Sequence, residues 1–315
     1  MDYMEKFFSK DGLAKKLSLK DKLSLTHEMG MQLFREVWTS YQNQLTDSYV
    51  SESEMLTWLD NVSQTPAHKL AITYFNPKLH NIERLPKEGG LIVTNHTTMF
   101  LADVLPVLHG VYEKRHRIVY GLFHRVFGES DMSKTLIGAP GKRDVAIKML
   151  KEGKYLLVCP EGIYGACRPF YNPHKIIREE GFKKMGYIDV AREANVPIIP
   201  IGNVGASETM INLGNMKKPV SCMFGWHKRI SRMVKVSKIV PMPINLLPLP
   251  SSVDAYIGDP IYISKQDSNL EINEMVINCL DELITNGLKE RRKLPDKIRG
   301  RILILCGRNI PESGM

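Results

Sequence analysis

The chain has 315 residues, of which 43% are hydrophobic and 24% charged, and its formal net charge is +9. This composition excludes a disordered or fibrous protein and is typical of a globular one with a substantial core. The charge predicts attraction to an anionic surface, and by itself it leaves both nucleic acid and membrane open as partners.

The cysteine content and the length of the apolar runs indicate which kinds of globular protein are disfavoured. The five cysteines are odd in number and contain no C-x-x-C pair, which disfavours a disulfide framework and a structural zinc site. We therefore expect a reducing compartment and no metal. No apolar run approaches the roughly 20 residues that span a bilayer, and the N-terminal residues lack the apolar core of a secretory signal peptide.

The N-terminal part of the chain has a helical pattern. Apolar residues recur at helical spacing from Lys20 to about Val62, which predicts two amphipathic helices, with Ser51 and Ser53 as start signals for the second. A break at Thr65-Pro66 follows. We predict an N-terminal helical extension over residues 1–65.

Beyond the turn at 87–90, short apolar runs alternate with helical patterns. The runs at 91–93, 118–120, 155–158 and 196–201 predict buried strands, and helices are expected over about 103–115, 143–152 and 179–195. A last strand is expected over 255–263, before a helix over about 271–292. This alternation predicts an α/β domain at 66–268, with a mostly parallel central sheet flanked by helices. A C-terminal helix and basic tail would occupy 269–315.

Polar motifs lie at the strand–helix junctions, where the catalytic and binding residues of open α/β sheets are usually found. They are Thr94-Asn95-His96, Gly141-Lys142-Arg143, Cys159-Pro160-Glu161-Gly162 and Gly202-Asn203. The sequence contains no G-x-S-x-G elbow, Walker loop or G-x-G-x-x-G turn. These absences disfavour an α/β-hydrolase and the common nucleotide-binding folds.

In their order and spacing these motifs resemble the four blocks of the phospholipid and glycerol acyltransferase family. The matching stretches are TNHTTMFLAD, GAPGKRD, VCPEG and NVPIIPIGN, and the resemblance covers roughly residues 70–265. It looks most like the eukaryotic branch that contains diacylglycerol-acyltransferase-like transmembrane proteins and plant phytyl ester synthases. The resemblance implies a glycerolipid-acyltransferase-like domain that transfers a fatty acyl group to a lipid acceptor, with acyl-CoA as co-substrate and no cofactor.

By this resemblance His96 is the general base and Asp103 its partner. An imidazole that removes the proton of the acceptor hydroxyl typically accelerates transfer ~10²–10⁴-fold, and a carboxylate holds its tautomer. The family usually places four residues between the two, whereas six lie between His96 and Asp103. On one continuous helix they would be ~10 Å apart, so pairing requires His96 in the preceding loop. Glu129 and Asp131 are possible substitutes for Asp103.

The resemblance assigns the other site residues to substrate binding: Asn95, Arg143, Pro160, Glu161, Gly162 and Arg168. Relatives with phosphorylated acceptors continue Pro-Glu-Gly with Thr and commonly Arg, whereas Ile163 and Tyr164 follow here. The missing cation favours mono- or diacylglycerol over lysophosphatidic acid or glycerol 3-phosphate. A catalytically weak lipid-binding member of the same fold stays an alternative.

Two segments combine basic with apolar residues. Lys228 to Lys238 precedes the apolar stretch 240–250, and Lys289 to Arg301 precedes the stretch 302–305. Such segments bind membrane interfaces. We expect binding at the cytoplasmic face of an intracellular membrane, the endoplasmic reticulum, and no nucleic-acid partner, because aromatic residues do not alternate with the basic ones.

Overall fold

The computed structural model describes residues 52–98, 102–123, 138–140, 142–218, 222, 241–245 and 248–291. The chain divides into two units, one of Met1–Tyr74 with Arg292–Met315 and the other of Phe75–Arg291. The first expected N-terminal helix, the substitutes Glu129 and Asp131, and most of both basic segments lie outside the described residues.

The described part of the first unit is helical. It contains α3 (Glu52–Ser63) and all but the last residue of α4 (Pro66–Phe75). α3 begins where the serine signals predict, whereas α4 begins at the expected break. Oγ1 of Thr65 accepts a hydrogen bond of 3.2 Å from the backbone N–H of His68. Thr65 therefore caps α4, and Pro66 is tolerated in the first helical turn because no intrahelical donor is needed there.

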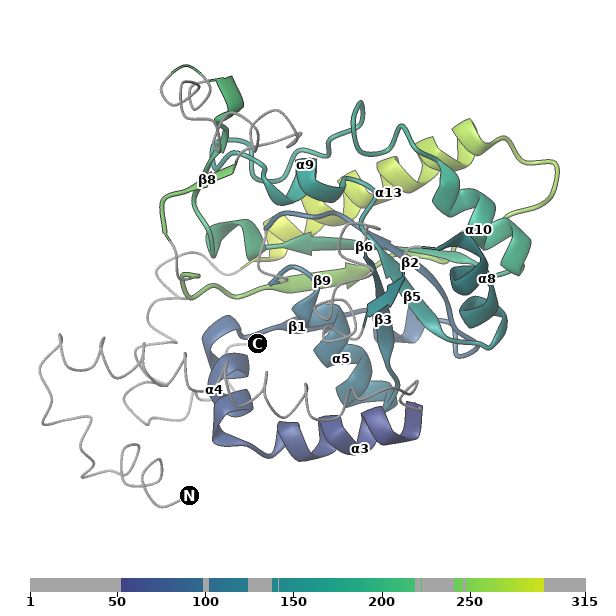
Figure 1. Cartoon of the computed structure of the whole chain (residues 1–315), viewed down its shortest axis with the longest axis horizontal. Helices are drawn as coiled ribbons and strands as arrows, with labels where there is room; N and C mark the ends of the chain where they lie inside the picture. Colours follow the sequence, from purple (N-terminus) through teal and green to yellow (C-terminus); the bar gives the residue numbers. More distant parts are fainter. Residues whose placement is uncertain are drawn as a thin grey trace, which may run out of the picture. The chain divides into compact units, whose positions relative to one another are not determined.

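The second unit is built on a seven-stranded sheet in the order β1-β9-β6-β2-β5-β3-β4 (Figure 1). Within the run β6-β2-β5-β3-β4, each strand is parallel to the next one in the sheet. β9 is antiparallel to β6 and parallel to β1. The predicted α/β fold with a mostly parallel sheet is confirmed. The strands are β1 (Lys78–His80), β2 (Gly90–Thr94), β3 (Val119–Phe123), β4 (Gly138–Pro140), β5 (Tyr155–Val158), β6 (Ile198–Val204) and β9 (Asp254–Ile257).

Helices cover both faces of this sheet. Side chains of α8 (Arg143–Lys151), α10 (Gly186–Ala194) and α13 (Asn269–Glu290) share one buried cluster, and α5 (Leu105–Arg115) contributes to another. In β2, Leu91 and Val93 belong to the first cluster and Ile92 to the second, because successive side chains of a strand point to opposite faces. Burial on both faces explains why the strands are continuous apolar runs.

The remaining elements are short. They are the helices α9 (Gly162–Ala166), η2 (Ile82–Arg84) and η3 (Ala206–Glu208), and the two-stranded pair β7 (Asn212–Asn215) and β8 (Pro241–Pro243). The C-terminal helix α13 contacts β6 and β9 within the second unit. None of the described helices is both long and apolar enough to cross a bilayer.

Candidate active site

The motifs that follow β2 and β5 meet at one edge of the sheet. The two strands are parallel neighbours, with Val93 opposite Val158. His96 lies in the loop after β2, and Glu161 lies in the turn between β5 and α9. Both motifs therefore stand at the C-terminal ends of adjacent strands, where open α/β sheets bind their ligands.

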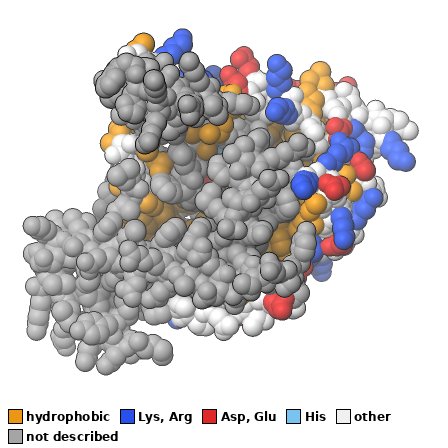
Figure 2. All heavy atoms as spheres, in the orientation of Figure 1, with side chains coloured by type: hydrophobic (Ala, Val, Ile, Leu, Met, Phe, Trp, Pro, Cys, Tyr) orange, Lys and Arg blue, Asp and Glu red, His pale blue; other side chains and the backbone are white. Residues whose placement is uncertain are grey.

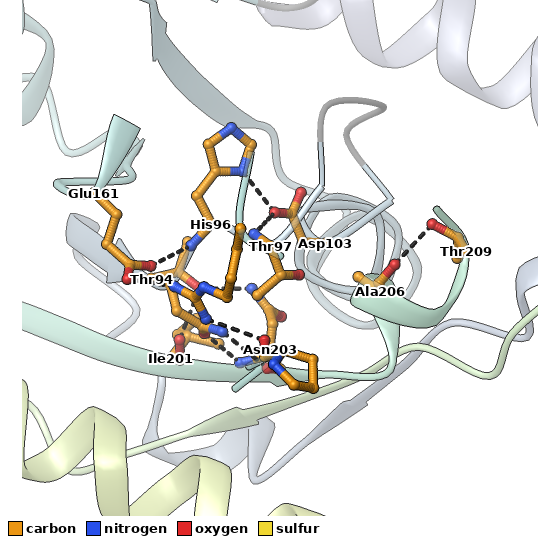
Figure 3. A network of polar contacts seen from close by, with 12 residues as sticks. Thr94, His96, Thr97, Asp103, Glu161, Ile201, Asn203, Ala206 and Thr209 are labelled. Carbon is orange, nitrogen blue, oxygen red and sulfur yellow. Dashed lines mark hydrogen bonds and ion pairs between the residues drawn. The ribbon is translucent and has the colours of Figure 1, made fainter. Parts of the chain in front are cut away.

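The side chains of His96 and Asp103 are in hydrogen-bond contact. Nδ1 of His96 lies 2.6 Å from Oδ2 of Asp103, and the second ring nitrogen, Nε2, points away from that carboxylate (Figure 3). The His96 side chain is 18% exposed and that of Asp103 is 0% exposed. Within the part of the chain that the structure describes, Nε2 has no hydrogen-bond partner. This arrangement leaves Nε2 available to a substrate hydroxyl.

The unusual spacing of the pair is accommodated by the local fold. Asp103 lies in the turn before α5, which begins at Leu105. Its Oδ2 also accepts a hydrogen bond of 2.7 Å from the backbone N–H of Thr97. Because neither His96 nor Asp103 is inside a helix, the two side chains are not held at the separation that one continuous helix would impose.

The Glu161 carboxylate joins the two motifs. Oε2 accepts a hydrogen bond of 2.9 Å from the backbone N–H of His96. Oε1 accepts one of 2.7 Å from the backbone N–H of Ile177 and another from the guanidinium of Arg168. All these partners are donors, which fits an ionised carboxylate. Both oxygens of Glu161 are thus occupied by the protein, and they fix the backbone of His96.

Arg168 is placed by the fold as a buried partner of Glu161. Its side chain is 2% exposed, and its Nη1 donates a hydrogen bond of 3.1 Å to the carbonyl oxygen of Pro173. Among the described residues its Nη1 and Nη2 thus both donate to protein acceptors, whereas the buried Nε has no hydrogen-bond partner. The structure connects Arg168 to His96 through Glu161, and its role in substrate binding stays a prediction.

Two glycines permit this close packing, and the sequence analysis did not single them out. A Cβ at Gly165 would lie 2.5 Å from the carbonyl oxygen of His96, and a Cβ at Gly181 would lie 2.6 Å from Cα of Glu161. Real side chains do not approach that closely, so only glycine fits at either position. The sequence signal, isolated glycines within otherwise ordinary stretches, becomes specific only once their spatial neighbours are known.

Asn95 is used inside the fold. Its Nδ2 donates to the carbonyl oxygen of Asn203 at 3.0 Å, and its Oδ1 accepts from the N–H of Asn203 at 2.7 Å. The Asn203 side chain donates to Oγ1 of Thr94 at 2.6 Å. These contacts (Figure 3) tie the end of β2 to β6. They give Asn95 a structural role beside its predicted one in substrate binding.

The other predicted substrate-binding residues lie in different settings. Arg143, at the start of α8, is 55% exposed and donates a hydrogen bond of 2.9 Å to Glu193 of α10, so the structure does not bring its guanidinium to His96. Pro160 is half-buried in the turn before Glu161. Gly162 has a φ of +51° with open space where a Cβ would stand, so its backbone angle rather than crowding favours glycine.

Comparison with known proteins agrees with this geometry. The family model described as Acyltransferase matches residues 76–204, a range that contains His96, Asp103, Glu161 and the strands that carry them. These residues form an acyltransferase-family domain. The glycerolipid resemblance found in the sequence motifs is thereby confirmed at the level of the family.

Known relatives of this chain share limited sequence identity with it. An uncharacterized protein of Mycobacterium tuberculosis is 23% identical over 243 residues, which is 70% of this chain and 64% of that protein. The human "DGAT1/2-independent enzyme synthesizing storage lipids" is 23% identical over 247 residues, 74% of this chain and 67% of that protein. The chain thus spans 64% of the length of the mycobacterial relative.

This chain is also similar to a solved structure. That structure is the 1-acyl-sn-glycerophosphate (LPA) acyltransferase PlsC of Thermotoga maritima, with 17% sequence identity and a TM-score of 0.49, covering 82% of this chain and 90% of that one.

The electrostatics of the acyltransferase domain favour a basic imidazole. Burial lowers the pKa of His96, but the charge and hydrogen bond of Asp103, with the charge of Glu161, outweigh it and raise the pKa above its ordinary value of 6.5. A raised pKa makes the imidazole a better proton acceptor.

The thiol of Cys159, near His96, is not activated as a nucleophile. Burial raises the pKa of Cys159 well above 9.0, and the charges of Asp103 and Glu161 raise it further. The thiol is therefore protonated and unreactive at neutral pH. His96 is the side chain at this edge with the geometry and basicity for proton transfer.

Proposed function

We propose that the acyltransferase domain transfers a fatty acyl group from acyl-CoA to a hydroxyl of a neutral glycerolipid, with His96 as general base. The observation that carries this proposal is the 2.6 Å contact between Nδ1 of His96 and Oδ2 of Asp103. It fixes the proton on Nδ1 and leaves the lone pair of Nε2 for the acceptor.

The proposed step needs no cofactor beyond the thioester donor. Nε2 of His96 takes the proton from the acceptor hydroxyl while the hydroxyl oxygen attacks the thioester carbonyl carbon. A carbon–oxygen bond forms, the carbon–sulfur bond breaks, and the imidazolium returns the proton to the leaving thiolate of CoA. The Asp103 carboxylate stabilises the imidazolium in between.

A neutral acceptor is supported by the positions of the two arginines. A phosphate carries up to two charges and needs convergent cationic or N–H donors to replace its water. Arg168 is buried against Glu161, and Arg143 is paired with Glu193. Ile163, which follows Gly162 directly, is an exposed apolar side chain of a kind that tolerates acyl chains better than anions.

The relatives support the same class of acceptor. The human relative is named for the synthesis of storage lipids, and esterification of mono- or diacylglycerol is a reaction of that kind. We place the protein at the surface of an intracellular membrane, the endoplasmic reticulum, because its lipid substrates reside in membranes.

The proposal is tested by comparing acceptors side by side. The purified full chain is incubated with labelled acyl-CoA and either monoacylglycerol, diacylglycerol, lysophosphatidic acid or glycerol 3-phosphate, and the labelled products are separated. We expect the neutral acceptors to give the higher kcat/KM. A preference for lysophosphatidic acid or glycerol 3-phosphate would overturn the proposed acceptor class, and no transfer to any acceptor would support the alternative of a lipid-binding member.

A further inference from the structure

Large apolar side chains are exposed around α9 and the β7–β8 pair. We call this set the apolar rim; its members, with exposed fractions, are Ile163 (46%), Phe170 (52%), Tyr171 (72%), Leu213 (39%), Ile244 (61%) and Leu249 (41%). Among the described side chains in view, Figure 2 shows hydrophobic ones on the side of this unit with α9 and β8. The side with α8 and α10 shows many charged ones.

Backbone hydrogen bonds connect segments that carry the rim side chains. The N–H of Phe170 donates to the carbonyl oxygen of Asn212 in β7 at 2.8 Å, and that of Ile244 donates to Ile211 at 2.8 Å. The rings of Phe170 and Tyr171 meet edge to face with centroids 5.7 Å apart. The rim is therefore held by ordered backbone rather than formed by isolated side chains.

The rim borders the candidate active site. Ile163 follows Gly162 in α9, the helix whose Gly165 lies against the carbonyl oxygen of His96. Phe170 lies two positions after Arg168, the partner of Glu161. A surface seated on the rim would therefore lie next to the loops that carry the His96–Asp103 pair.

The charge of the segment between β7 and β8 indicates the charge of a surface that could bind the rim. β7 ends at Asn215 and β8 begins at Pro241, so residues 216–240 connect two strands of the rim in the sequence. That stretch contains no Asp or Glu, and its basic residues are Lys217, Lys218, Lys228, Arg229, Arg232, Lys235 and Lys238. Apolar side chains beside concentrated positive charge fit an anionic lipid surface. We therefore favour a membrane over a protein as the partner.

We infer that the apolar rim is the surface by which this protein docks on an anionic membrane, with the His96 site turned toward the lipid. The inference rests on the proposed function in one respect, because a lipid acceptor must reach His96 from the bilayer. Docking itself is a separate property and is measured separately.

The experiment compares two rim variants, Tyr171→Glu and Ile244→Glu, with unmodified protein in sedimentation with phosphatidylcholine vesicles that do or do not contain phosphatidylserine. An acidic side chain at an interfacial apolar position opposes both the apolar and the electrostatic attraction. We expect each variant to bind phosphatidylserine-containing vesicles about tenfold more weakly. Vesicles without phosphatidylserine should bind the unmodified protein less tightly.

Two matched controls lie elsewhere on the molecule. Tyr262 is 73% exposed and Leu270 is 60% exposed, which matches Tyr171 and Ile244. Tyr262 follows the bridge between Ile261 and Ile198, at the beginning of β6 and so at the opposite edge of the sheet from His96. Tyr262→Glu and Leu270→Glu should bind vesicles like the unmodified protein, and thermal melting of all four variants checks that they are folded.

The outcomes separate docking from catalysis. Turnover of a short-chain acyl-CoA and a monomeric soluble acceptor measures the chemistry without vesicles. If rim variants bind vesicles as tightly as the unmodified protein, or the control variants lose as much binding, the docking inference is wrong even where turnover is normal. If the rim variants disrupt a dimer in light scattering while vesicle binding is unchanged, the rim is an interface between copies and the inference is likewise overturned. Selective loss of vesicle binding supports docking even where no acceptor is turned over, in which case only the proposed function fails.

Discussion

Oε2 of Glu161 accepts a hydrogen bond of 2.9 Å from the backbone N–H of His96, across 65 positions of sequence. The same carboxylate accepts a hydrogen bond from Arg168, whose side chain is also buried. The Pro-Glu-Gly turn thus acts on the proposed base through its backbone.

Glu161→Gln should destabilise the protein by about 3–5 kcal/mol, because it leaves the guanidinium of Arg168 buried without its counter-charge. Replacing both partners by Met should recover much of this stability. Turnover should stay low in that double variant, because the N–H of His96 has still lost its acceptor. Chemical denaturation and kcat are the two measurements.

An exposed arginine provides the control for that experiment. Arg178 is 47% exposed and pairs with Glu274 at 3.1 Å and Asp281 at 3.0 Å. Exposed ion pairs contribute less than about 1 kcal/mol, so Arg178→Ala should change stability little. If Glu161→Gln and Arg178→Ala have the same effect, Glu161 does not hold the buried network described here.

The pH dependence should report the His96–Asp103 contact. His96 acts as a base only when neutral, so kcat/KM should fall as the pH drops through its pKa, which Asp103 raises above 6.5. In Asp103→Asn burial still lowers this pKa while the Asp103 charge is gone. The acidic limb should therefore move to lower pH as the maximal rate falls. An unmoved limb would show that His96 is not the titrating base.

Because the contact is only 2.6 Å, we expect the two residues to act as a unit. The variant with both His96→Ala and Asp103→Asn should be no slower than His96→Ala alone, as is typical of residues that work together. Independent, multiplying losses in kcat/KM would show separate roles.

Gly165→Ala should impair turnover because its Cβ would lie 2.5 Å from the His96 carbonyl oxygen. Overpacking of this kind costs about 1–3 kcal/mol, and displacing a catalytic group by about 1 Å can cost ~10²-fold in rate. Gly186→Ala is the matched control, because no atom lies within 4 Å of its Cβ position. Loss of activity in both variants, or in neither, would contradict this packing.

Arg143→Ala should leave turnover of diacylglycerol almost unchanged, because the Arg143 guanidinium pairs with Glu193 on α10 rather than with the site. The measurement is the KM of the Arg143→Ala variant for diacylglycerol, which should be close to that of the unmodified protein. A steep rise in that KM would mean that Arg143 reaches the acceptor in the working enzyme.

The sequence predicted the sheet well because its strands are buried on both faces and so form continuous apolar runs. The expected strand 155–158 coincides with β5, and 91–93 lies inside β2. The three-residue strands β1 and β4 carry too short a pattern to be seen. The Thr65-Pro66 pair can mark either a break in the chain or the start of a helix. The hydrogen bond from the N–H of His68 to Thr65 shows that a helix starts there.

The sequence motifs named His96, Asp103 and Glu161, which the structure brings together, but they did not indicate the further contacts of the site. The motifs placed His96 and Glu161 after predicted strands, and the structure shows that these strands are parallel neighbours, so their ends lie together. The environments of Arg168 and Asn95 were not predictable, because burial against Glu161 or Asn203 depends on contacts distant in sequence. The same holds for Gly165 and Gly181, whose necessity is visible only beside the backbone that they approach.

The central claim, that His96 is the base of acyl transfer, is tested most directly by the rate of labelled acyl transfer from acyl-CoA to diacylglycerol in His96→Ala. The imidazole is proposed to act in the transition state, so kcat should fall by at least ~10²-fold while acceptor binding and the melting temperature stay nearly unchanged. Near-normal turnover in a folded His96→Ala protein would contradict the account.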